Sequence, residues 1–170
     1  CVDFLANLHA SFWNQLSDVQ WLPNMSGSDN ATNMALGCEA GWPQLQEIFG
    51  EFVPDNIEAM RERYLAAIPT LQAKLDQYPK TLIHGDFRMD NMLFGQAPEH
   101  DALLVVDFQG PLKGNGIHDV AYLLSHSAKT NVRREHERDL IERYANGLIT
   151  AGIKDYSVKK AWNDYRVGVL

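Results

Sequence analysis

The 170 residues predict an α+β fold that is mostly helical and contains a small β part. Long stretches carry apolar residues at intervals of three and four, which is the pattern of amphipathic helices packed on a core. Near the middle of the chain, three short apolar runs bounded by polar or glycine-containing segments have the pattern of buried strands. Because a chain of this length can form one well-packed core, we expect a single domain.

Composition and charge exclude several classes of protein. The formal net charge of −7 argues against a nucleic-acid partner, because phosphate backbones are held by clustered Lys and Arg. No apolar run approaches about 18 residues and the first residues lack the features of a signal peptide, so we expect neither membrane insertion nor secretion. Cys1 and Cys38 form neither a disulfide framework nor a metal-binding spacing, which indicates free thiols and a cytoplasmic protein.

The first half of the chain is predicted to contain two helical segments separated by loops. Apolar residues recur at helical intervals over residues 4–16 and again over residues 57–77. We interpret residues 17–55 as long loops around short helical pieces, because the turn formers Gly, Pro, Ser and Asn are frequent there. Pro69 is expected to kink the second helical segment or to divide it in two.

The second half combines the predicted strands with further helices. Residues 110–116 have the composition of a loop between these two groups of elements. The strand-like runs comprise residues 81–83, 91–94 and 103–106, and helices are expected over residues 117–128, 133–151 and 158–169, with Gly152 as the C-cap of the middle one.

Three polar residues beside the strand-like runs have the layout that phosphoryl transfer from ATP requires. Asp86 lies between the first two runs, where a carboxylate can orient an attacking hydroxyl and take its proton. Asn91 and Asp107 supply the amide and carboxylate oxygens that Mg²⁺ prefers. Each residue alone has an ordinary explanation as a turn former, a cap or a polar strand end. Because all three should converge at one end of a small sheet, we predict a magnesium site beside Asp86.

The motifs that contain these residues resemble a known family. His-Gly-Asp at residues 84–86 with Asn91, and Asp-Phe-Gln at residues 107–109, are similar to the catalytic core of the aminoglycoside phosphotransferase and choline kinase group. Residues 5–13 and 114–124 are most similar to its ecdysteroid-kinase-like branch and bacterial relatives. The resemblance implies the C-terminal lobe of a protein-kinase-like fold over residues 1–170, with a small β-hairpin-type sheet that carries the catalytic loop. It also implies ATP and Mg²⁺ as cofactors and a small-molecule alcohol as substrate.

The same resemblance implies a role for each site residue. Asp86 would be the catalytic base, Asn91 and Asp107 the ligands of the Mg²⁺ bound with ATP, and Asp119 a buried anchor of the catalytic loop. His84 would brace this loop through hydrogen bonds and take no part in proton transfer.

Two other residues near these motifs are left outside the predicted site. His9 lies on the apolar face of the first helical segment and has the features of a hydrogen-bonded core histidine. Arg88 is open to two interpretations, as a contact to phosphate oxygens or as a solvated partner of Asp90.

The chain also departs from the kinase pattern. Gln109 stands where protein kinases have glycine, which disfavours a mobile activation segment and a peptide substrate. No glycine-rich loop, strand lysine or partner glutamate precedes Leu82. We therefore expect the N-terminal lobe that clamps the nucleotide to be absent from these residues, and the chain alone to have little or no activity.

The acceptor substrate is left open by the sequence. Five acidic residues and no Lys or Arg occur over residues 39–58, and aromatic residues lie in and near this segment. A segment of this kind overhanging the site would favour a cationic or hydrophobic alcohol, whereas a solvated acidic face would favour none. Sterol-like, aminoglycoside-like and choline-like acceptors all remain candidates. The aromatic residues are Trp21, Trp42, Phe49 and Phe52.

Two alternative functions come from other classes. A metal-dependent phosphohydrolase is suggested by His84, Asp86, His118 and Asp119, which together imitate a histidine and aspartate metal cluster. A non-catalytic kinase-like binding module is the other alternative, although such a module has no need of Asp86 together with both metal ligands.

Overall fold

The computed structural model describes residues 1–54, 56–77 and 79–169, without the side chains of Ser28 and Asn30, and it confirms a mostly helical α+β fold. None of the helices in these ranges is long and apolar enough to cross a membrane. Cys1 and Cys38 are both free. The helices are α1 (Val2–Ser11), α2 (Ser28–Phe49), α3 (Ile57–Leu75), α4 (Ile117–Ser127), α5 (Thr130–Thr150) and α6 (Val158–Gly168), and the strands are β1 (Thr81–Ile83), β2 (Met92–Phe94), β3 (Leu103–Val105) and β4 (Leu112–Gly114).

The strands form two separate antiparallel pairs, whereas one small sheet was expected. β1 pairs with β4, so that Thr81 lies opposite Gly114, and β2 pairs with β3, so that Met92 lies opposite Val105. The prediction of a loop over residues 110–116 was therefore wrong for β4. This short strand is stabilised by distant partners, because Lys113 also exchanges backbone hydrogen bonds with the segment around Pro23, and local composition does not carry that information.

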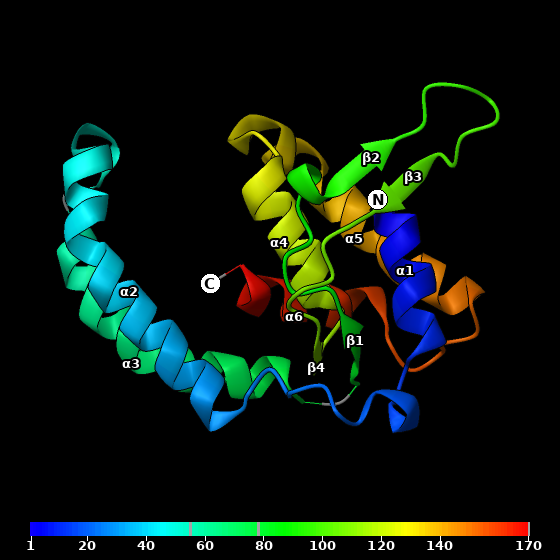
Figure 1. Ribbon diagram of the computed structural model, residues 1–170, viewed down its shortest axis with the longest axis horizontal. Helices are drawn as coiled ribbons and strands as arrows, with labels where there is room; N and C mark the ends of the chain where they lie inside the picture. The colour runs from blue at the N-terminus through cyan, green and yellow to red at the C-terminus, as the bar shows by residue number, and fades with distance from the viewer. Residues whose placement is uncertain (55, 78, 170) are drawn as a thin grey trace.

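Four helices and β1 enclose the hydrophobic core. Helix α1 packs against α5, and α6 packs against both α4 and α5 (Figure 1). Burying these apolar faces is the main source of stability, at about 25 cal/mol for each Å² removed from water. The side chains buried most completely include Leu5, Ile83, Phe87, Ile117, Val120, Ile141, Tyr144, Leu148 and Tyr156.

Helices α2 and α3 form a hairpin that points away from this core (Figure 1). The prediction of long loops around short helical pieces over residues 17–55 agrees with residues 17–27 but is wrong for residues 28–49, where α2 continues for 22 residues through Gly37, Gly41 and Pro43; residue 55 lies outside the described residues. Contacts with α3 override the low helix propensity of these residues: Trp42 donates its Nε1–H to Glu58 at 2.7 Å. Helix α3 is likewise a single helix that includes Pro69, so of the two effects expected of this proline, a kink or a division, the division is wrong.

The C-terminal helices follow the prediction closely. Helices α4 and α6 match the expected ranges to within one residue, and α5 begins three residues earlier than expected, at Thr130. Gly152 follows α5 with φ +100°, a conformation that glycine adopts without strain at the end of a helix. Helix α4, which carries Asp119 beside the predicted site, is therefore predicted closely from the sequence.

Candidate active site

The loop that contains Asp86 begins at a glycine that no other residue can replace without strain. Gly85 lies two residues after the end of β1, beyond His84, and has φ +85°. A Cβ atom at this position would lie 2.5 Å from the carbonyl oxygen of Gly110. The backbone therefore turns sharply at Gly85, which places Asp86 outside the strand and beside helix α4.

A buried aspartate on α4 holds the backbone of this turn. The carboxylate of Asp119 accepts hydrogen bonds from the backbone N–H groups of His84, at 2.7 Å, and of Gly85, at 3.0 Å. It also lies 3.2 Å from His9 Nε2, and His9 Nδ1 lies 2.8 Å from the Tyr144 hydroxyl. Burial acts to raise the pKa of Asp119, but His9, the charge of His118 and the backbone N–H of His84 outweigh it, and the pKa lies below its ordinary value.

The ring of His84 connects the loop to the segment before Asp107. His84 Nε2 lies 3.0 Å from the carbonyl oxygen of Val106, and the backbone N–H of Asp86 donates to His84 Nδ1 at 3.3 Å. Because Nδ1 accepts a hydrogen bond, the partners select the tautomer that carries its proton on Nε2. The ring also packs against Phe108, with centroids 4.4 Å apart. The contacts of His84 therefore hold the loop against the segment before Asp107.

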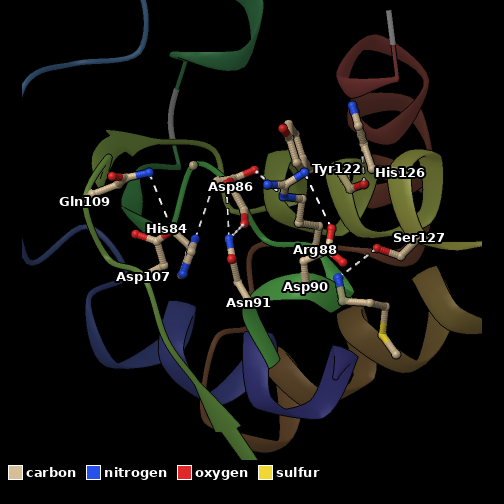
Figure 2. Close-up of polar contacts among 12 residues, drawn as sticks. His84, Asp86, Arg88, Asp90, Asn91, Asp107, Gln109, Tyr122, His126 and Ser127 are labelled. Atoms are coloured by element: carbon tan, nitrogen blue, oxygen red, sulfur yellow. Dashed lines mark hydrogen bonds and ion pairs between the residues drawn. The ribbon is translucent and has the colours of Figure 1, made fainter. Parts of the chain in front are cut away.

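Asp86 and Asn91 are in direct contact (Figure 2). The Asn91 amide donates from Nδ2 to the backbone oxygen of Asp86 at 2.9 Å and to its carboxylate Oδ2 at 3.0 Å. This arrangement uses the amide nitrogen and leaves the side-chain oxygen of Asn91 as a ligand for a hard cation. The donor set in this part of the loop therefore fits Mg²⁺.

Arg88 lies beside the same carboxylate. Its Nε lies 3.3 Å from Asp86 Oδ1, and its Nη1 lies 3.5 Å from Asp90 Oδ2. The structure therefore gives Arg88 both carboxylates as partners. Partial burial acts to raise the pKa of Asp86, but the neighbouring Tyr122, the hydrogen bond from Asn91 and the charge of Arg88 outweigh it and lower the pKa. Asp86 is thus ionised at neutral pH, as a proton acceptor must be.

Asp107 stands next to this pair in a strained conformation. Its φ is +66°, a value that residues other than glycine rarely adopt, at a cost of about 1–3 kcal/mol. The backbone N–H of Val106 donates to the carbonyl oxygen of Asn91 at 3.0 Å, which holds the two predicted metal ligands on adjacent backbone segments. The Asp107 carboxylate itself is exposed and accepts from Gln109 Nε2 at 3.5 Å. Strain of this kind persists where the surroundings enforce it, and it is common at functional sites.

Tyr122 is the site residue that the sequence analysis missed. It lies on α4, about one turn after Asp119, and its proximity to the Asp86 carboxylate contributes to lowering the pKa of Asp86. Burial and the neighbouring Asp86 carboxylate raise the pKa of Tyr122. The available signal was its spacing: residues three apart share one face of a helix, so a helix that anchors the loop through Asp119 also presents Tyr122 to it.

A metal cluster of the phosphohydrolase kind is not found. Among residues 1–54, 56–77 and 79–169, no group of three or more His, Cys, Asp or Glu side chains has the geometry to hold a metal ion. His118 instead packs against Tyr122, with ring centroids 6.0 Å apart. The phosphohydrolase alternative is therefore not favoured, whereas a magnesium site of the kinase type needs only one or two protein ligands besides phosphate and water.

A small apolar cavity of about 80 Å³ lies where the α2–α3 hairpin meets α4 and α6. Its lining is almost entirely apolar, with His118 and Gln72 as the polar exceptions. The acidic residues of the hairpin do not line it, and Figure 1 shows the tip of the hairpin well apart from α4. The remaining lining residues are Met25, Met34, Tyr64, Ile68, Leu71, Leu75, Val167 and Gly168.

The chain is similar to one known protein family and to one curated protein. The model of the ecdysteroid kinase-like family matches residues 15–154. Among curated proteins, the chain is similar to acyl-CoA dehydrogenase family member 10 of Mus musculus, with 31% identity over 85 residues that cover 43% of this chain. The chain spans about 8% of the length of that relative.

Proposed function

The chain belongs to the ecdysteroid kinase-like family, and from this premise we propose that it takes part in transferring the γ-phosphoryl group of ATP to a hydroxyl group of a small molecule. The observation that carries the proposal is the contact between Asp86 and Asn91, 3.0 Å apart, on a loop whose backbone is held by buried Asp119. This contact puts a proton acceptor and a metal ligand side by side, as phosphoryl transfer to an alcohol requires.

Each residue has a distinct task in the proposed reaction. Asp86 orients the acceptor hydroxyl toward the γ-phosphorus and takes its proton as the new P–O bond forms and ADP leaves. The side-chain oxygens of Asn91 and Asp107 would hold Mg²⁺, which when bound supplies positive charge that offsets the charge on the triphosphate. His84 and Asp119 keep the loop in place and do not touch the reactants.

Part of the ATP site is proposed to come from outside these residues. The chain contains no glycine-rich loop and no strand lysine before Leu82, and such groups grip the phosphates in kinases. We therefore propose that a preceding lobe, in the parent protein, completes the site. The 170-residue chain alone should show little or no ATP-dependent transfer, and turnover at an ordinary kinase rate would contradict this part of the proposal.

The decisive experiment screens hydroxylated small molecules with the parent protein, ATP and Mg²⁺. Phosphorylated product should form only with Mg²⁺ present, and Asp107→Ala should reduce its rate at least about a hundredfold. Transfer that survives in Asp107→Ala and after removal of divalent cations would remove the mechanism. Release of phosphate without any acceptor would favour a phosphohydrolase instead.

A further inference from the structure

Helix α4 contacts the loop formed by residues 84–91 at both ends of the loop. Near the start of the helix, Asp119 accepts the two backbone N–H groups with which this loop begins. At the last residue of the helix, the hydroxyl oxygen of Ser127 accepts the backbone N–H of Met89 at 3.0 Å, and Figure 2 shows Ser127 beside the loop. Asp119 and Ser127 are separated by about 12 Å along α4. One core helix therefore holds the loop at two separate points.

The hydrogen bond from Met89 to Ser127 supplies a helix cap that the loop itself lacks. Met89 begins the short 3₁₀ helix η3 (Met89–Asn91), and the first N–H groups of a helix have no partner inside it. The side chain of the preceding residue often supplies the acceptor, but the Arg88 side chain makes no capping hydrogen bond. A guanidinium group contains only donors, so Arg88 has no acceptor to offer. Ser127 provides this acceptor from another element.

Burial does little to fix the beginning of η3. Met89 is 45% exposed, and the side chain of Asp90 is 79% exposed. Because little apolar surface is removed from water there, packing stabilises this part of the loop only slightly. The hydrogen bond to Ser127 is therefore an important contact between the beginning of η3 and the core.

The last residue of η3 is the predicted metal ligand Asn91. Its backbone N–H donates to the carbonyl oxygen of Arg88 at 3.0 Å, and its side-chain amide donates to Asp86 Oδ2, also at 3.0 Å. Both bonds lie within the loop, so the direction of Asn91 Oδ1 follows the orientation of η3. Mg²⁺ requires nearly octahedral ligands at about 2.0–2.1 Å, so a small shift of this oxygen weakens metal binding.

We propose that Ser127 is a positioning residue, whose hydroxyl accepts the Met89 N–H and thereby holds η3 so that Asn91 Oδ1 is available to the metal. This role rests on the proposed phosphoryl transfer and adds to it an anchor of the metal ligand. Ser127 itself touches neither the metal nor the reactants. Its loss should therefore weaken the dependence on metal and leave the chemical step nearly unchanged.

The first test is Ser127→Ala in the parent protein, with saturating ATP and an acceptor found in the screen. The free Mg²⁺ concentration that gives half of the maximal rate should rise about three- to tenfold, the range expected for the loss of one neutral hydrogen bond. The maximal rate and the KM for the acceptor should stay within about twofold of wild type. A merely structural role would lower the melting temperature and leave the Mg²⁺ dependence unchanged.

The second test measures metal binding without turnover. Mn²⁺ shares the preference of Mg²⁺ for octahedral oxygen ligands, and electron paramagnetic resonance measures the free ion. In the parent protein with a non-hydrolysable ATP analogue, the dissociation constant for Mn²⁺ should rise about three- to tenfold in Ser127→Ala. A dissociation constant equal to that of wild type would overturn the role of Ser127.

Two further variants serve as controls. Ser127→Thr keeps a hydroxyl group at this position and should restore the wild-type metal dependence. Ser125→Ala is the matched control, because the Ser125 hydroxyl donates to the Ala121 carbonyl oxygen within α4, at 2.7 Å. It should keep the wild-type values in both tests. An equal change in Ser125→Ala, or no recovery in Ser127→Thr, would overturn the proposed role.

Asp86→Asn separates this role from the proposed function. If Asp86→Asn abolishes transfer while Ser127→Ala keeps the wild-type metal dependence, the proposed function stands and the role of Ser127 is wrong. If Asp86→Asn keeps wild-type transfer, or if the parent protein shows no Mg²⁺-dependent transfer, the proposed function fails and the role of Ser127 fails with it.

Discussion

The region around α4 and the α2–α3 hairpin differ in which side chains they bury. Polar side chains are buried around α4, whereas apolar side chains are exposed in the hairpin. Around α4, Asp119, His9 and His84 are fully buried, and each has hydrogen-bond partners from other elements. In the hairpin, large apolar side chains are exposed instead, including Ile48 at 67% and Phe52 at 77%.

This difference indicates where the structure tolerates change. A buried polar network has no alternative partners, so the loss of one member leaves the others unsatisfied at a cost of several kcal/mol. A solvated helix surface exchanges a lost contact for water at little cost. The loop that contains Asp86 is held by this buried network, so equivalent substitutions should have larger effects there than in the hairpin.

The largest effect is expected for Asp119→Ala. Removing this carboxylate leaves His9 and the backbone N–H groups of His84 and Gly85 without their buried acceptor, so the free energy of unfolding should fall by about 3–5 kcal/mol. Urea denaturation measures this change. Glu58→Gln, which alters an exposed acceptor of Trp42 in the hairpin, should cost less than about 1 kcal/mol. Equal losses in the two variants would refute the comparison.

Gly116→Ala should also destabilise the region around α4. Its added Cβ would lie 2.5 Å from His9 Nδ1 and 2.6 Å from the Tyr144 hydroxyl, which would force these two groups apart. We expect a loss of about 1–3 kcal/mol in the free energy of unfolding, from overpacking and the disturbed hydrogen bond. A thermal melting curve unchanged from wild type would show that His9 and Tyr144 can move apart without loss of stability.

Acid should weaken the fold through His118. Burial lowers the pKa of His118 below its ordinary value of 6.5; the charges of His126 and His9 act in the same direction, and that of Asp119 opposes them. Below pH 6.5 the unfolded chain binds a proton at His118 more readily than the folded chain does. The contribution of neutral His118 to the free energy of unfolding is therefore fully present above pH 6.5 and is lost as the pH falls. The loss should reach at most about 1.4 kcal/mol for each pH unit.

Urea midpoints at pH 7.5 and pH 5.5 measure the contribution of His118. His118→Gln should reduce the difference between the two midpoints, whereas His136→Gln on the exposed surface of α5 should preserve it. A difference that is the same in His118→Gln and in wild type would assign the acid sensitivity to other groups.

The smallest effect, and the only gain, is expected in the hairpin. A Cβ at Gly37 would have no heavy atom within 4 Å apart from its chain neighbours and the nearby backbone of its own helix, and Gly37 lies in the interior of α2. Gly37→Ala should therefore stabilise the chain by about 0.5–1 kcal/mol through its higher helix propensity. A loss of stability in calorimetry would mean that the hairpin packs against something at this position.

The same contrast explains which parts could be predicted from the sequence. The strands beside Asp86 and Asn91 and the helix around Asp119 were predicted to within a residue or two, because short apolar runs and a helical stripe leave clear patterns there. The continuity of α2 could not be predicted in this way. Its Gly37 and Pro43 resemble turn formers, and only the contacts with α3 make them helical.

The candidate site shows a similar limit. The sequence predicts that Asp86 and Asn91 lie close together, and the structure puts them in contact. It does not predict the positive φ of Asp107 or the approach of Tyr122 to Asp86, because both depend on how the loop packs against α4. Local motifs identify groups with chemical functions, whereas the groups that orient them come from the tertiary structure.

The central claim is that Asp86 is the base in phosphoryl transfer to an alcohol. The most direct measurement compares the rate of ATP-dependent acceptor phosphorylation in the parent protein for Asp86→Asn and for Asp90→Asn, whose carboxylate is 79% exposed in the same loop. We expect a loss of about a hundredfold or more for Asp86→Asn and a rate within about twofold of wild type for Asp90→Asn. Wild-type transfer by Asp86→Asn would contradict it.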